Sequence, residues 1–195
     1  EHLQLLEQVL ERLNRYHLTI HKRKCVFFQK EVSYCGYRVD GEGLHKTAEK
    51  VQSLTEALPP SNVSQLRAFL GMVNYCHRFL PHLSTTLAPL HHLLIKETKL
   101  VWSTECVAAF DKMKQLMSSD TVLTHFNPKL PLVLSCDASA YGLGAVLSHT
   151  MPDGGERPVA YASRTLWPAE CNYAQIDKEA LAVVWGVKKF HQYLY

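Results

Sequence analysis

The chain has 195 residues, of which 47% are hydrophobic and 20% are charged, and its formal net charge is +3. This length can bury one or two cores, and the ordinary composition excludes a disordered or fibrous chain. A net charge of +3 is too small to indicate a nucleic-acid partner by itself. No apolar run approaches the roughly 20 residues of a membrane span, so we expect no membrane partner.

The N-terminus and the cysteines indicate the compartment. Residues 1–4 are amphipathic and acidic, unlike a signal peptide. They also lack an initiator methionine, so we expect the chain to be cut from a longer protein. The six cysteines lack metal-ligand spacing, and four lie in apolar surroundings. We expect an intracellular protein of the cytoplasm or nucleus, in a reduced state and not secreted.

The first quarter of the chain predicts a helix and a hairpin. Residues 3–20 repeat leucine, valine and tyrosine at helical spacing. Residues 24–28 and 32–39 are β-rich and flank a short polar turn, which predicts the two strands of a hairpin. Cys25 and Cys35 would face each other across it, although this alone does not predict a disulfide.

Two helices follow. Residues 46–57 predict a short helix that ends at paired prolines. Asn62 predicts the N-cap of the next helix, with Gln65 at the capping-box position, and Pro81 ends that helix. Its expected core stripe consists of Leu66, Phe69, Leu70, Val73 and Cys76 or His77.

Two further helices are expected before the pattern changes. Residues 82–96 predict a helix around a break at Pro89. Ser103, directly after Trp102, predicts the N-cap of another helix. The apolar positions expected on the inner face of that helix are Val107, Phe110, Met113, Leu116 and Met117.

After Asn127-Pro128 the hydrophobic period changes from helical to alternating. Residues 130–137, 143–150 and 157–164 predict three strands separated by glycine-containing turns. Residues 170–194 predict one long helix. Its expected inner stripe is Ile176, Ala180, Val183, Val184, Val187 and Phe190, which leaves Asp177 and Lys178 exposed. The order of elements predicts an α+β fold, with helices followed by a β-β-β-α unit.

Two carboxylates occupy costly places in this pattern. Asp137 ends the first of the three strands, and Glu179 falls on the predicted inner stripe of the last helix. Two carboxylates in contact repel unless a proton or cation lies between them, so a hard divalent ion is expected. Two structural alternatives stay open. Asp137 can cap the turn that follows it, and Glu179 becomes a surface residue if the helix phase is off by one.

A basic stretch runs from residue 15 to residue 50. It holds eight Lys and Arg residues against four Asp and Glu residues, and three histidines lie among them. Such a surface suits a phosphate backbone. An ordinary solvated face explains the same charges equally well.

The chain resembles the Pol polyprotein of gypsy-type long-terminal-repeat retrotransposons. Three blocks resemble the opening of its ribonuclease H domain, namely 136–148, 157–166 and 170–185. Two blocks resemble the thumb of its reverse transcriptase, namely 66–75 and 78–81, and residues 24–25 and 34–37 resemble the end of its palm. The resemblance covers essentially the whole chain in order.

The resemblance implies three parts. Residues 1–43 would be the end of the palm, a helix plus a hairpin. Residues 44–98 would form the helical thumb. Residues 99–195 would be a connection helix and the N-terminal part of a ribonuclease H-like domain, with its core at 130–195.

It also implies an enzyme that hydrolyses the RNA strand of RNA–DNA hybrids, coupled to RNA-directed DNA synthesis. Asp137 and Glu179 match the first metal-binding Asp and the helix Glu of the family, so both are expected to be catalytic residues and ligands of Mg²⁺ or Mn²⁺. The complete domain would hold two ions. The family needs further acids on later strands, so we expect the 195-residue chain alone to be inactive. The strand that bears Asp137 should then have an open edge.

The implied partners are an RNA–DNA hybrid, a primer-template and the remainder of the polyprotein. Cys136, Cys35 and Tyr37 depart mildly from the usual family residues, and the last two adjoin the primer in related polymerases. The candidate nucleic-acid contacts are Tyr34, Gly36, Tyr37, Lys46, Lys50, Arg67, Ser139 and Arg164. The alternative is a domesticated or degenerate module that binds nucleic acid or acts as a scaffold without catalysis.

Overall fold

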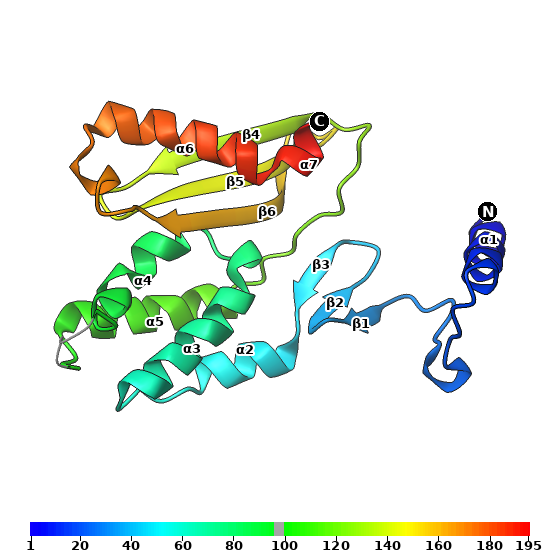
Figure 1. The fold of residues 1–195 in the computed structure, drawn as a ribbon, viewed down its shortest axis with the longest axis horizontal. Helices are drawn as coiled ribbons and strands as arrows, with labels where there is room; N and C mark the ends of the chain where they lie inside the picture. The colour runs from blue at the N-terminus through cyan, green and yellow to red at the C-terminus, as the bar shows by residue number, and fades with distance from the viewer. Residues whose placement is uncertain (96–99) are drawn as a thin grey trace. The chain divides into compact units, whose positions relative to one another are not determined.

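The computed structural model describes residues 1–95 and 100–195 (Figure 1). The chain divides into two compact units, residues 1–30 and residues 31–195. Among the described residues, no helix combines the length and the hydropathy needed to cross a bilayer. The predicted boundaries of the palm, thumb and connection parts stay predictions.

The first unit is built on the helix α1 (His2–Arg15) and a 3-10 turn, η1 (Lys22–Lys24). The helix ends earlier than predicted because His17 adopts a positive φ of 55°, and the N–H of Leu18 donates to the carbonyl of Leu13. None of the helix residues is buried. The strand predicted at 24–28 is absent, so this half of the predicted hairpin is wrong.

The hairpin lies later in the chain than predicted. The strands β1 (Val32–Tyr34), β2 (Tyr37–Val39) and β3 (Leu44–Lys46) form an antiparallel sheet in that order. Cys35 and Gly36 form the first turn with φ of 46° and 68°, as a tight hairpin turn requires. The predicted second strand is therefore itself a hairpin. Cys25 belongs to the other unit, and all six cysteines are free.

Asp40 organises the second turn of this sheet. Its Oδ1 accepts hydrogen bonds from the backbone N–H groups of Glu42 (2.9 Å) and Gly43 (3.1 Å) and lies 2.9 Å from His45 Nε2. Arg38 Nη1 lies 3.1 Å from its Oδ2. The hydrogen bond from His45, which outweighs the effect of burial, lowers the pKa of Asp40 to about 2.

Asp40→Asn is expected to destabilise the protein at neutral pH, because the amide cannot replace a charged acceptor. The unfolded-state pKa of Asp is about 3.9, so the stability from this carboxylate is complete above that pH. It is lost as the pH falls through about 2. Urea unfolding of both proteins from pH 7 to pH 2 should show their difference shrinking between pH 4 and pH 2. A difference that stays constant across that range contradicts the assignment.

Four α-helices form the layer below the second sheet (Figure 1). They are α2 (Ala48–Thr55), α3 (Val63–Tyr75), α4 (Leu83–His92) and α5 (Thr104–Ser118), with a 3-10 turn, η2 (His77–Phe79), after α3. Asn62 Oδ1 accepts a hydrogen bond from the backbone N–H of Gln65 at 2.9 Å. Ser103 Oγ accepts one from the backbone N–H of Cys106 at 3.3 Å, so both predicted N-caps are confirmed.

The predicted inner faces of these helices are largely correct. The stripe of α3 is buried from Leu66 to Val73, and Cys76 directly after it is 1% exposed. On α5, Val107 is 48% exposed, and Cys106 and Ala109 take its place in the core. Pro89 lies inside α4 rather than at a break. Residue 96 of the predicted helix lies outside the described residues.

The second sheet contains the three predicted strands. They are β4 (Leu132–Ala138), β5 (Gly142–Thr150) and β6 (Glu156–Thr165), antiparallel in the order β4-β5-β6. In the part of the chain that the structure describes, β4 pairs only with β5, which confirms the expected open edge on the strand of Asp137. The predicted α+β class is therefore confirmed.

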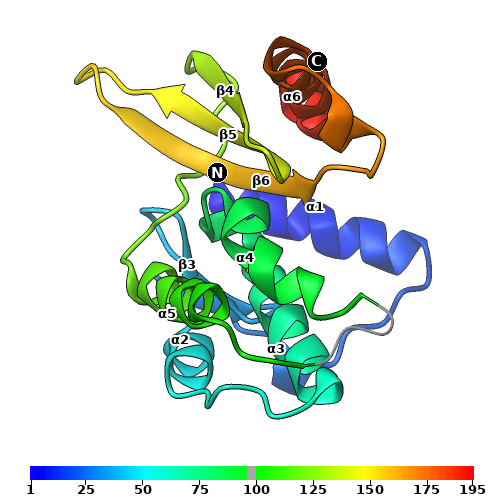
Figure 2. The same cartoon turned by 90° about the vertical axis from the view of Figure 1, so that its left-hand side faces the viewer.

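The sheet lies between two helical layers, as Figure 2 shows from the side. The helix α6 (Gln175–Lys189), preceded by η3 (Glu170–Asn172), packs on one face. The N-terminal end of α4 and the turn η2 pack on the other face. The predicted long helix breaks at Phe190, and a short α7 (His191–Leu194) follows.

The predicted phase of the last helix is wrong. Ile176, Val183 and Val184 are 77%, 53% and 52% exposed, whereas Lys178 is buried. The buried positions of the helix interior are Lys178, Ala182 and Gly186. Ala182 and Gly186 are small and let the helix approach the sheet closely. Phe190, at the end of the predicted stripe, is buried as predicted.

Candidate functional site

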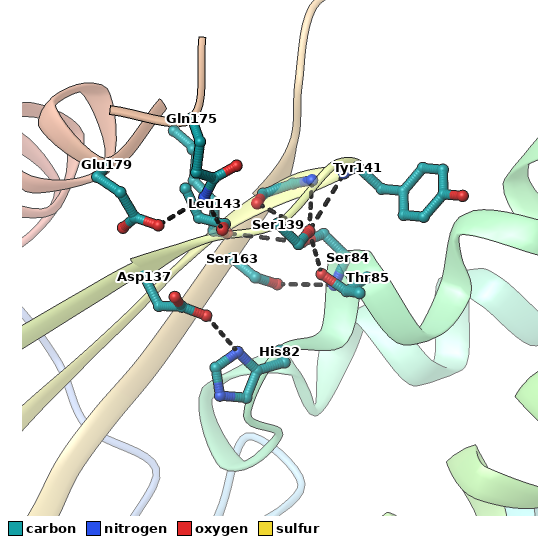
Figure 3. A network of polar contacts seen from close by, with 12 residues as sticks. His82, Ser84, Thr85, Asp137, Ser139, Tyr141, Leu143, Ser163, Gln175 and Glu179 are labelled. Carbon is teal, nitrogen blue, oxygen red and sulfur yellow. Dashed lines mark hydrogen bonds and ion pairs between the residues drawn. The ribbon is translucent and has the colours of Figure 1, made fainter. Parts of the chain in front are cut away.

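Asp137 stands near the C-terminal end of β4, where the alternation of the strand sets its direction. Cys136 faces α6, and its Sγ would lie only 2.5 Å from a Cβ added at Gly186. Asp137 therefore points to the opposite face, where η2 and α4 pack. Its side chain is 61% exposed, and its Oδ2 lies 3.7 Å from Nδ1 of His82 (Figure 3).

Glu179 reaches the same end of the strand from α6. Gln175, four residues earlier on the helix, donates from Nε2 to Glu179 Oε1 at 2.6 Å and to the carbonyl of Ala138 at 2.9 Å. Gln175 thus ties the carboxylate to the residue that follows Asp137 (Figure 3). Residues four apart lie side by side on a helix, so this contact follows from the local sequence.

The two carboxylates do not contact each other. Within residues 1–95 and 100–195, no hydrogen bond or ion pair joins Asp137 to Glu179, and each has its own partner, His82 or Gln175. They flank the end of β4 from opposite faces. The prediction that both residues belong to one site stays a prediction, and the expected contact between the two carboxylates is absent among the described residues.

The turn after Asp137 is capped by a different residue. Ser139 Oγ accepts from the N–H groups of Tyr141 (3.2 Å) and Gly142 (3.0 Å). It also lies 2.8 Å from the hydroxyl of Thr85 on α4. Asp137 therefore does not cap this turn; Ser139 does.

The site fits a hard divalent ion in its donor chemistry. Both groups are carboxylates, Asp137 is well exposed and Glu179 partly so. Among the described residues, no group of three or more His, Cys, Asp or Glu side chains is arranged to hold a metal ion. An ion bound to these residues would therefore keep several water ligands, as Mg²⁺ commonly does.

Two glycines of the motif after Asp137 make room for α4. A Cβ at Gly142 would clash with Ser84 Oγ, and one at Gly144 would lie 3.3 Å from His82 Nδ1. The N–H of Ser84 donates to Ser163 Oγ at 3.1 Å, which anchors the start of α4 on the sheet. Sequence reasoning identified the glycines as turn residues and missed this docking.

Three of the residues predicted to contact nucleic acid form hydrogen bonds with other residues of the chain. Lys46 Nζ donates to the carbonyl of Ser119 at 2.6 Å, beyond the end of α5. Arg164 forms two hydrogen bonds with Glu170, at 2.7 and 2.9 Å, and these lower the pKa of that carboxyl. Ser139 caps its turn. These contacts favour structural roles for all three, and their predicted nucleic-acid role stays a prediction.

Three more of these residues form an aromatic cluster with the end of α3. Lys50 Nζ lies 3.1 Å from the ring centroid of Tyr75, and Tyr37 stacks on the same ring at 5.2 Å. Tyr37 also donates from its hydroxyl to the carbonyl of Tyr75 at 2.7 Å, and burial raises its pKa to about 12. A Cβ at Gly36 would lie 2.6 Å from Lys50 Nζ, and the positive φ of 68° favours glycine at this position.

The remaining two candidates are accessible. Tyr34 is 70% exposed on β1, and Arg67 is exposed on α3. Between α2 and α3 lies a groove lined by Glu49, Lys50, Ser53, Leu54, Ala68, Gly71, Met72 and Tyr75. Lys50 and Tyr75 therefore belong to an open surface as well as to the aromatic cluster.

Comparison with known proteins identifies the part of the chain that carries Asp137 and Glu179. Residues 102–195 match a family described as "RNase H-like domain found in reverse transcriptase". This segment, slightly less than half of the chain, is similar to that family. The matched segment includes α5, the second sheet and α6. The predicted resemblance to a reverse transcriptase with an RNase H-like domain is confirmed.

The whole chain is similar to retrotransposon polyproteins. It is 35% identical over 194 residues to the Transposon Tf2-3 and Tf2-4 polyproteins of Schizosaccharomyces pombe. The match covers 100% of this chain and 15% of each polyprotein. The chain thus corresponds to a segment of a retrotransposon polyprotein and spans only a small part of the length of these relatives. Nothing in these comparisons supports the alternative of a non-catalytic module.

Solved structures share the fold. A foamy viral protease-reverse transcriptase dRH in complex with ds DNA matches 98% of this chain and 34% of its own length, with a TM-score of 0.78. A foamy viral protease-reverse transcriptase in complex with an RNA/DNA hybrid matches 97% of this chain and 26% of its own, with a TM-score of 0.77. Both are 22% identical in sequence, so they establish the fold alone.

Proposed function

We propose that the RNase H-like domain takes part in metal-dependent hydrolysis of the RNA strand of an RNA–DNA hybrid, within a reverse transcriptase polyprotein. The observation that carries this proposal is the placement of two carboxylates at one end of β4. Asp137 comes from the strand, and Glu179 is held beside Ala138 by Gln175.

Asp137 and Glu179 would be the ligands that this chain supplies to Mg²⁺ or Mn²⁺. When bound, two such ions would activate the attacking water and stabilise the leaving oxygen. Gln175 orients Glu179 by fixing one of its oxygens, which leaves the other oxygen available. Asp137, at 61% exposure, offers a carboxylate that a phosphate-bound ion can reach.

The helices α2 and α3 would bind the primer-template or the hybrid. Lys50 and Tyr75 line the groove between α2 and α3, and Arg67 lies exposed on α3. A basic side chain suits a phosphate, whereas an aromatic edge suits a sugar or base. The hybrid would be recognised by its shape and 2′-hydroxyls rather than by its sequence.

The test uses a longer polyprotein that includes this chain and a hybrid with end-labelled RNA. Cleavage of the RNA strand is expected with Mg²⁺ or Mn²⁺, and none with EDTA or with the same RNA unpaired. DNA synthesis by the same preparation serves as the positive control for folding. A preparation that synthesises DNA but leaves the hybrid intact contradicts the proposal, as does cleavage that persists in EDTA.

A further inference from the structure

His82 has an unusual backbone conformation beside Asp137. It stands directly before α4 with φ 49° and ψ 32°, the left-handed region, and makes no side-chain cap hydrogen bond to that helix. A non-glycine residue in this conformation is strained. The surrounding structure therefore maintains a strained residue at this position.

The imidazole of His82 lies beside the sheet, close to Asp137. Nδ1 of His82 lies 3.7 Å from Oδ2 of Asp137, and both side chains are 61% exposed. The imidazole also lies over Gly144, where an added Cβ would come within 3.3 Å of Nδ1. A small pocket, lined also by Pro81 and Tyr161, opens beside them. An alanine at position 144 would therefore press on the imidazole and shift it.

The separation is too long for a hydrogen bond and suits two ligands of one ion. Hydrogen bonds from nitrogen to oxygen span about 2.7–3.2 Å. Nitrogen and oxygen donors bound at about 2.1 Å to one ion lie roughly 3 to 4.2 Å apart, depending on the angle at the ion. The 3.7 Å between His82 and Asp137 falls in that range. Their exposure leaves room for the water ligands that such an ion keeps.

We propose that His82 supplies a nitrogen ligand to the divalent ion bound by Asp137, and that it biases the site toward Mn²⁺ over Mg²⁺. This inference rests on the proposed function. Imidazole nitrogen is a better donor to transition-metal ions than to Mg²⁺, which prefers oxygen. The helical layer thereby contributes one ligand to a site otherwise built by the RNase H-like domain.

The experiment measures metal binding by the 195-residue chain without nucleic acid. Electron paramagnetic resonance counts bound Mn²⁺, and spin-echo modulation detects a nitrogen coordinated to it. Mg²⁺ affinity follows from competition. His82→Gly removes the imidazole, and glycine accepts the left-handed backbone without strain. His82→Asn also tolerates this backbone and offers an oxygen instead.

The wild type is expected to show a nitrogen coupling that His82→Gly and His82→Asn lack. His82→Gly should weaken Mn²⁺ binding about tenfold, the scale of losing a supporting ligand group, and Mg²⁺ binding much less. His82→Asn should lower the preference for Mn²⁺ over Mg²⁺. Gly144→Ala, which displaces the imidazole without removing it, should give an intermediate affinity.

Asp137→Asn separates the two proposals. If it weakens Mn²⁺ binding while His82→Gly changes neither affinity nor coupling, the role of His82 is overturned and the Asp137 site stands. If Asp137→Asn leaves Mn²⁺ binding unchanged, both the role of His82 and the proposed metal-dependent function are contradicted. Tighter binding of both ions by His82→Gly also overturns the inference, since His82 would then compete with the metal.

Discussion

Replacing Asp137 by asparagine is expected to abolish hybrid cleavage by a polyprotein that includes this chain, with a loss of more than about 10²-fold. Removing a partner of a metal ligand already costs 10- to 100-fold, so removing the ligand itself should cost at least as much. The amide keeps the shape of the side chain but lacks its charge. Among the described residues, the Asp137 carboxylate makes only a long, exposed contact with His82, so the fold should not depend on the charge.

The measurement is single-turnover cleavage of labelled RNA in the hybrid, with DNA synthesis assayed in parallel. Glu179→Gln should cause a similar loss, because a glutamine oxygen can still accept from Gln175 while the charge is gone. Asp177→Asn is the matched control, since Asp177 is exposed on the same helix and should retain full cleavage. Equal cleavage by wild type and Asp137→Asn, with DNA synthesis intact in both, refutes the assignment.

Elements with strong local signals were predicted well. The strands β4, β5 and β6 alternate or run apolar between glycine-containing turns, and their bounds differ from the predicted ones by at most two residues. The N-caps Asn62 and Ser103 were also found, because a cap depends on residues only three positions apart.

Predictions failed where a backbone conformation or a small residue decided the structure. The turn at Cys35 and Gly36 needs two residues with positive φ, and cysteine rarely adopts it, so the hairpin was placed too early. On α6 the branched apolar residues were assigned to the core. Ile176, Val183 and Val184 are exposed, since the buried positions that approach the sheet include Ala182 and Gly186 instead.

The site was predictable only in part for a related reason. Asp137 and Glu179 were identified from positions that were expected to be buried and from the family resemblance, although Asp137 is in fact 61% exposed. The i, i+4 spacing of Gln175 and Glu179 was available in the sequence and could have revealed their hydrogen bond. His82 had no local signal, because its contact with Asp137 joins residues 55 positions apart through the docking of α4 on the sheet.

The close approach of α6 to the sheet gives the largest expected effect on stability. A Cβ at Gly186 would lie 2.5 Å from Sγ of Cys136, closer than real side-chain contacts allow. Gly186→Ala should therefore destabilise the protein by about 2 kcal/mol, the usual cost of overpacking, although alanine is the better helix former. Gly71→Ala on α3 is the matched control, because nothing lies within 4 Å of its added Cβ. It should stabilise the protein by up to about 1 kcal/mol.

Urea unfolding of the two variants should thus give shifts of opposite sign. The clash itself is tested by Cys136→Ala, which removes the sulfur. The next atoms near the new Cβ are those of Ala145 and Leu134, at 3.5 and 3.6 Å, which are ordinary contacts. Gly186→Ala should then cost little in the Cys136→Ala background, so the two changes are strongly non-additive. Additive losses would mean that α6 does not lie on Cys136. The position of Glu179, which depends on how α6 lies against β4, would then have to be revised as well.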